Sequence, residues 1–129
     1  MWRERALKIL LVLLGLLFVA GIYPLMTLVR NAWQANNEDA TPMMLSLYVA
    51  LGIFLLTAVR NPSAHRSLIA FTAWSSFAHA AVMTIMAVHV TSAREGLLEV
   101  SALLAVIGVA LIALAPAKHP MERPSTVVA

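Results

Sequence analysis

Cysteine is absent from this sequence, and charged residues are scarce. Without cysteine the chain has no disulfide, no thiolate metal ligand and no cysteine nucleophile. Charged residues make up 12% of the 129 positions, whereas soluble domains carry about 25%. Hydrophobic residues make up 61% and are concentrated in long uncharged runs. This composition indicates a single-domain membrane protein, with no room for a soluble enzyme domain.

Recognisable motifs of site chemistry are also missing. The sequence contains no HExxH, no glycine-rich phosphate loop and no Ser-His-Asp order. Only one histidine lies deep in an apolar run, whereas intramembrane haem usually needs two axial ligands on facing helices. We therefore expect no catalytic residue, no metal site and no cofactor. The net charge of +3 comes from basic residues that flank apolar runs, so we expect contact with the lipid bilayer and no nucleic-acid partner.

Four apolar runs predict an all-α membrane protein, a four-transmembrane-helix antiparallel bundle. The predicted helices span about residues 7–29, 42–59, 67–90 and 97–115 within a domain of residues 1–116. Short connections make neighbouring helices antiparallel. We expect Pro24 to kink the first helix, Thr41 to cap the second, and residues 117–129 to form a flexible cytoplasmic tail.

The basic residues predict the orientation of the bundle. An even number of spans places the N-terminus, the middle turn and the C-terminal tail on one side. That side holds seven of the nine basic residues, namely Arg3, Arg5, Lys8, Arg60, Arg66, Lys118 and Arg123. The other side holds only Arg30 and Arg94. The positive-inside rule then predicts a multi-pass protein of the bacterial inner membrane with both termini in the cytoplasm.

His79 is the one ionisable residue near the middle of an apolar run. An ionisable residue at that depth indicates a functional site and is expected to face the bundle interior. Ser75, four residues earlier, and Thr72, seven earlier, lie on the same helical face, and Ser76 lies beside it. These four residues form the predicted intramembrane polar site. The favoured interpretation is interhelical packing by hydrogen bonds, and the alternative is binding of a ligand or proton at His79.

Two further groups of polar residues lie near the membrane surfaces. His89 and Glu99 lie near the outer ends of adjacent helices and could form a pH-sensitive pair, although we favour a simple interfacial pair whose polar groups extend to water. Arg60, His65 and Arg66 occupy the middle turn. We favour a topological role for them, with binding of anionic lipid headgroups as the alternative.

Three segments resemble a known family. They are GIYPLM at residues 21–26, YVALGIFLL at residues 48–56 and RNPSAHRSLIAFTAWSSFAH at residues 60–79. Together they resemble the BphX-like family of small bacterial inner-membrane proteins of unknown function, over roughly residues 5–115. The resemblance implies four helices in the inner membrane and supplies no catalytic residue. It also suggests an accessory role near aromatic-compound catabolism.

We therefore predict a non-catalytic accessory or interaction protein that acts as a homo-oligomer or with a membrane-protein partner. A small transporter or permease for apolar or aromatic compounds, using His79, is the first alternative. A membrane-embedded redox or quinone-linked subunit is the second.

Overall fold

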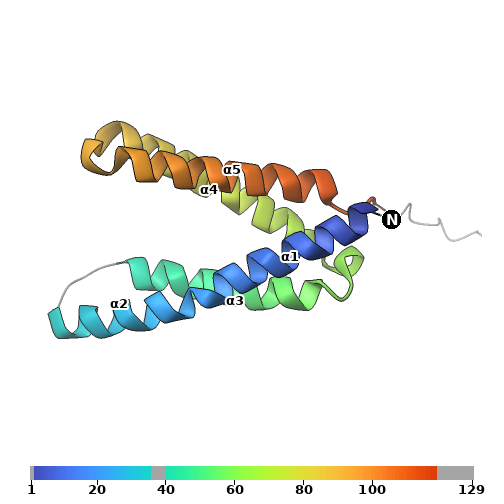
Figure 1. The fold of residues 1–129 in the computed structure, drawn as a ribbon, viewed down its shortest axis with the longest axis horizontal. Helices are drawn as coiled ribbons and strands as arrows, with labels where there is room; N and C mark the ends of the chain where they lie inside the picture. The colour runs from blue at the N-terminus through green and yellow to red at the C-terminus, as the bar shows by residue number, and fades with distance from the viewer. Residues whose placement is uncertain (1, 36–39, 119–129) are drawn as a thin grey trace, which may run out of the picture.

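The computed structural model describes residues 2–35 and 40–118, and the regular secondary structure in this part of the chain is all helical (Figure 1). The α-helices are α1 (Trp2–Ala20), α2 (Ile22–Ala35), α3 (Thr41–Ala58), α4 (Arg66–His89) and α5 (Arg94–Leu114). Two short 3₁₀ helices, η1 (Pro62–His65) and η2 (Thr91–Ala93), form the turns before and after α4.

Four segments of the described chain are long and apolar enough to cross a membrane. They are Trp2–Asn31, Thr41–Ala58, Pro62–His89 and Thr91–Leu114. Large apolar side chains on these segments point outward, as Leu13, Phe71 and Val106 do with at least 60% of their surface exposed. Such exposure would be unfavourable in water and is expected of helices that contact lipid. The predicted all-α, four-span class is confirmed.

The first span consists of two helices, α1 and α2, that are separated at Gly21. Pro24 lies in the first turn of α2, where its ring would clash with the carbonyl of Ala20 in a continuous helix. The chain relieves this clash at Gly21, whose N–H donates to the Phe18 carbonyl over 3.1 Å. Pro24 therefore interrupts the helix as predicted, although the break itself lies three residues earlier.

The helix ends differ from the predicted ends in several places. The first span begins at Trp2, and α2 continues to Ala35, so the segment after residue 29 that we expected to be a loop begins as helix. The N-cap residue of α3 is Ala40 rather than Thr41, with Pro42 in the first turn. The helix α5 starts at Arg94, three residues early, and Glu95 in its first turn complements the helix dipole. Most of the predicted tail, residues 119–129, lies outside the described residues.

The helices form two hairpins, one of α1, α2 and α3 and the other of α4 and α5 (Figure 1). Small residues bring the backbones together in each. A Cβ atom on Gly52 of α3 would lie 2.9 Å from the carbonyl oxygen of Gly15 on α1. A Cβ atom on Gly108 of α5 would lie 3.1 Å from the carbonyl oxygen of Ala73 on α4. These contacts are of the kind that small residues allow between membrane helices.

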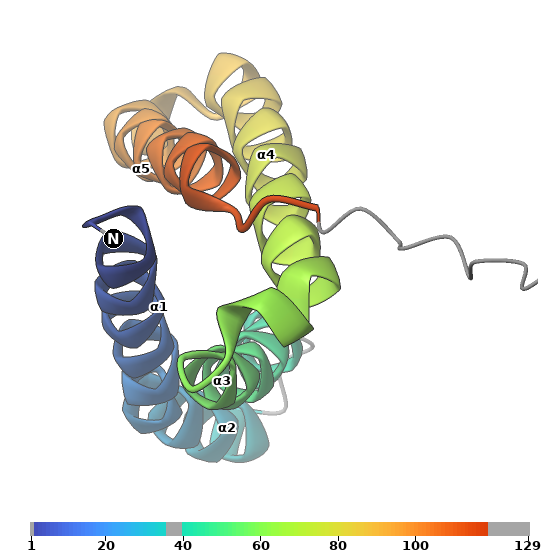
Figure 2. The same cartoon turned by 90° about the vertical axis from the view of Figure 1, so that its right-hand side faces the viewer.

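The two hairpins meet at one end of the molecule and separate at the other (Figure 1). The first end, called here the η1 end, holds η1, the start of α1 and the end of α5, which lie toward the viewer in Figure 2. Leu7, Leu55, Ile69 and Leu111 belong to the buried core that joins the hairpins. The opposite end, called the η2 end, holds η2 and the start of α3. The four spans are thus packed as two pairs that diverge toward the η2 end.

Candidate functional site

A cleft of about 530 Å³ lies between the two hairpins. The first hairpin contributes the start of α3, and the second contributes one face of α4 and a residue of α5. Its lining residues are Ala40, Thr41, Met44, Ala78, His79, Val82, Met83, Met86 and Leu97. Within residues 2–35 and 40–118 no Asp, Glu, Lys or Arg lines the cleft, and most of the lining residues are apolar. Predominantly apolar lining with a few polar groups is typical of small-molecule sites of this size.

His79 is held in this cleft by a tyrosine from the other hairpin. The Tyr48 hydroxyl on α3 is hydrogen-bonded to Nδ1 of His79 on α4. The two ring centroids are 5.7 Å apart. On its other side Tyr48 makes an edge-on contact with Phe18 of α1, with centroids 5.1 Å apart. Three half-buried rings therefore connect α1, α3 and α4 midway along the molecule.

The three hydroxyl residues predicted to accompany His79 bond to their own helix instead. Thr72 donates to the Leu68 carbonyl over 2.9 Å, and Ser76 and Ser75 donate to the Thr72 carbonyl over 2.7 and 3.1 Å. Thr72 and Ser76 are buried, and none of the three lines the cleft. The predicted face of α4 is therefore divided: His79 lines the cleft, while the three hydroxyl groups donate to backbone carbonyls of their own helix.

The hydrogen bonds across the second hairpin involve Ser101 and Thr84, which are not among the predicted polar-site residues. Ser101 Oγ on α5 lies 2.8 Å from the Ala80 carbonyl oxygen and 2.7 Å from Thr84 Oγ1 on α4. Thr84 also reaches the Ala80 carbonyl, over 2.8 Å.

His89 and Glu99 are both exposed, and no hydrogen bond or ion pair joins them in the described part of the chain. The nearby cation Arg94 instead donates from Nε to the Ala87 carbonyl over 3.0 Å, close to the end of α4. This contact places a positive charge where the helix dipole favours it.

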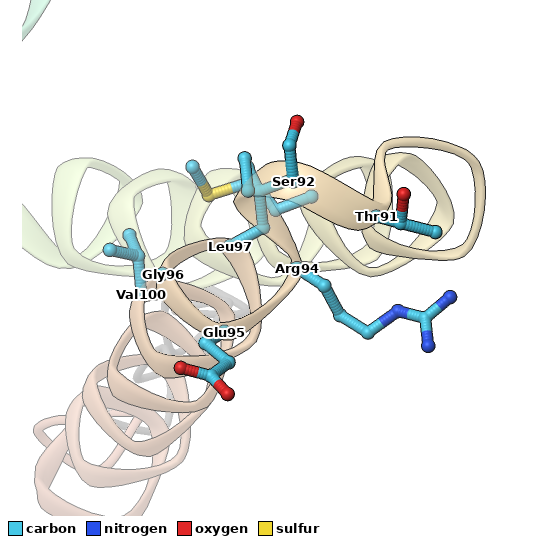
Figure 3. Close-up of a pocket in the computed structure, with 9 residues that line it drawn as sticks. Thr91, Ser92, Arg94, Glu95, Gly96, Leu97 and Val100 are labelled. Atoms are coloured by element: carbon cyan, nitrogen blue, oxygen red, sulfur yellow. The ribbon is translucent and has the colours of Figure 1, made fainter.

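A second hollow of about 800 Å³ lies at the η2 end (Figure 3). It is lined by the residues from Thr91 to Leu97 together with Met83 and Val100. The side chains of Arg94 and Glu95 extend from it in different directions (Figure 3). Met83 and Leu97 line both hollows, so the second hollow adjoins the cleft that contains His79.

The turn at the η1 end has a defined local structure. His65 Nδ1 donates to the Asn61 carbonyl over 3.0 Å, and the Ala64 N–H donates to the Asn61 side chain over 3.3 Å. Arg60 is exposed and Arg66 is half-buried. Two cations therefore flank an ordered turn, and their contact with lipid headgroups stays a prediction. Within residues 2–35 and 40–118 no cluster of three or more potential ligand side chains could hold a metal ion.

Comparison with known proteins places the chain in one family. A family model described as a family of unknown function (DUF6632) matches residues 3–126. The chain belongs to DUF6632. No curated protein and no solved structure matches it. The narrower resemblance to the BphX-like family is not confirmed by this match, so DUF6632 is the family of this multi-pass protein with four apolar spans.

Proposed function

We propose that this DUF6632 protein is a non-catalytic accessory protein of the bacterial inner membrane that binds apolar molecules within the bilayer. The observation that carries this proposal is the cleft between the hairpins. Its volume of about 530 Å³ falls within the range of about 300–1,000 Å³ for small-molecule sites. The hairpins diverge toward the η2 end (Figure 1), and the cleft is lined by residues of both hairpins.

The polar groups at the cleft support binding more than a reaction. His79 is paired with Tyr48, and the described residues that line the cleft with it include no carboxylate, serine or second histidine. A general base or nucleophile is normally oriented by a further polar partner next to the reacting atom. A histidine ring nitrogen in a mostly apolar wall instead resembles the few polar groups that orient a bound ligand.

Filling the cleft with a larger side chain tests this proposal. Val82 lines the cleft, whereas Val106 on α5 is 65% exposed and lines none of the hollows described here. We expect Val82→Trp to abolish saturable binding of diphenylmethane to the protein in lipid nanodiscs, and Val106→Trp to leave it unchanged. Empty nanodiscs give the partition into lipid, which is subtracted. If wild-type protein shows no saturable binding, or if Val82→Trp binds as well as wild type, the proposal is wrong.

A transport function is the second candidate, and the adjoining hollows favour it. They extend from the η2 end to His79 and share Met83 and Leu97. If the protein is a transporter, it should carry a bound compound across the membrane of liposomes, and His79→Phe should abolish this transport. Saturable binding without any such transport would support the accessory role instead.

The proposed orientation places both termini and η1 in the cytoplasm, in agreement with the charge distribution. Since the chain has no cysteine, the labelling of a single introduced cysteine can report on which side of the membrane that residue lies. Ser63 in η1 and Ser92 in η2 are both exposed. We expect a membrane-impermeant maleimide to label Ser92→Cys in cells whose inner membrane is intact, and Ser63→Cys only after that membrane is opened. The reverse pattern would contradict the orientation.

The link to aromatic-compound catabolism is a narrower part of the proposal and depends on the resemblance to the BphX-like family. A homo-oligomer or a membrane-protein partner also stays a prediction. The many exposed apolar side chains on the helices are compatible with contact to lipid or to another membrane protein.

A further inference from the structure

We infer that the cleft selects neutral, mainly apolar molecules that carry a hydrogen-bond acceptor such as a ketone oxygen, which accepts from Nε2–H of His79. This inference rests on the proposed function and adds to it the chemical class of the ligand. It depends on three features of the described residues: the direction of the bond from Tyr48 to His79, the accessibility of Nε2, and the lack of charge in the wall.

The first feature is the tautomer of His79. The Tyr48 hydroxyl is half-buried and has one hydrogen-bonding partner in the described chain, Nδ1 of His79. A phenol in an apolar environment needs an acceptor for its proton, because an unsatisfied buried donor is costly. Tyr48 therefore donates to Nδ1. In the neutral imidazole the ring proton is then on Nε2, so this nitrogen is a donor.

The second feature is that Nε2 remains accessible. No fully buried side-chain nitrogen or oxygen in the described chain lacks a partner, and Nε2 takes part in no hydrogen bond there. Nε2 therefore keeps some accessible surface, and His79 lines the cleft. An unpaired donor facing a hydrocarbon environment gains most from a ligand that brings an acceptor.

The third feature is the wall around His79. Among the residues that the structure describes, none that lines the cleft carries a charged side chain that could balance an ionised ligand. Removing an unpaired charge from water is strongly unfavourable. Three of the lining residues are the methionines Met44, Met83 and Met86. Methionine side chains adapt to ligands of different shape. The wall thus favours neutral molecules without specifying their outline, and His79 supplies a directional contact.

A matched pair of probes separates the acceptor from the apolar contact. Benzophenone and diphenylmethane have two phenyl rings each and differ in the central carbonyl group. We expect wild-type protein in nanodiscs to bind benzophenone about 3- to 10-fold more tightly than diphenylmethane, once partition into empty nanodiscs is subtracted, as one hydrogen bond would provide. His79→Phe should lower this ratio to about 1 while it keeps the apolar contact.

Two conservative variants check the direction of the hydrogen bonds. His79→Gln keeps an N–H donor on the same helix and should retain part of the preference for the ketone. Tyr48→Phe no longer holds the proton on Nε2 and should reduce the preference without removing binding of diphenylmethane. Helix content and elution as a single species confirm that each variant is folded before binding is compared.

The outcomes distinguish this inference from the proposed function. Equal affinity of the wild type for both probes would overturn the inference, and so would a ketone preference that survives in His79→Phe. In both cases binding that Val82→Trp abolishes would still support the cleft as a binding site. If neither probe shows saturable binding, or if Val82→Trp leaves it intact, the proposed function and the inference both fail.

Discussion

Tyr48 and His79 are hydrogen-bonded to each other across two helices, α3 and α4, that belong to different hairpins. A second side-chain hydrogen bond between the hairpins lies at the η1 end and runs from Arg3 to the Ala113 carbonyl oxygen, over 2.7 Å. The pair of Tyr48 and His79 therefore holds the two hairpins together where the cleft begins.

Replacing Tyr48 by phenylalanine removes this bond and keeps the aromatic ring. We expect the free energy of unfolding to fall by about 0.5–1.5 kcal/mol, the usual net value of one hydrogen bond. The hairpins should also separate further at the η2 end. Spin labels on Met44→Cys and Met86→Cys, which lie on opposite hairpins, would report a longer or broader distance distribution.

Tyr23→Phe is the matched control, since that tyrosine is 80% exposed on α2. It should change neither stability nor the distance between the labels. An unchanged distance in Tyr48→Phe would show that helix packing alone holds the hairpins.

His79 was predictable as a polar site, whereas its partner was not. The depth of His79 follows from its place in a long apolar run, and an ionisable residue is rare and unfavourable at that depth in the bilayer. Tyr48 also lies in an apolar run, but tyrosine is compatible with many positions along a membrane helix. Its contact depends on how α3 lies against α4, and helical periodicity within one segment does not specify that.

The hydroxyl residues of α4 show another limit of periodicity. Spacing placed Thr72 and Ser75 on the face of His79. It did not show that their hydroxyls would donate to carbonyls three or four residues earlier in the same helix. Ser and Thr side chains in a helix can always form such local bonds instead of bonds to a neighbouring helix. A distortion of the first span was predictable from Pro24. The break lies at Gly21 because the proline ring would clash with the carbonyl of Ala20, four residues earlier.

Adding a methyl group at Gly52 should separate α1 from α3. Its Cβ would lie 2.8 Å from Phe18 Cβ and 2.9 Å from the Gly15 carbonyl oxygen, so backbone as well as side chain must shift. We expect Gly52→Ala to lower the free energy of unfolding by about 1–3 kcal/mol, the usual cost of overpacking. Unfolding in mixed detergent micelles measures this change.

Gly96→Ala is the control for helix propensity, because nothing lies within 4 Å of a Cβ atom there. On α5 it should be neutral or stabilise the protein by up to about 1 kcal/mol, since alanine is the better helix former. Equal effects of the two substitutions would show that α1 and α3 are not in close backbone contact.

Ser101→Ala should loosen the second hairpin without affecting the first. The substitution removes the contacts of Ser101 Oγ with the Ala80 carbonyl and with Thr84 Oγ1. Interhelical hydrogen bonds in membrane proteins contribute about 0.6 kcal/mol on average and at most about 1.7 kcal/mol. We expect a loss of stability within that range, because Thr84 still has the Ala80 carbonyl as a partner.

Ser46→Ala is the matched control for this substitution, since Ser46 is exposed and donates to the Met43 carbonyl of its own helix. A double-mutant cycle with Thr84→Val isolates the shared bond. Strictly additive losses would mean that Ser101 and Thr84 act independently, and that α4 and α5 are held together by small-residue packing at Gly108 and Ala73 rather than by this hydroxyl pair.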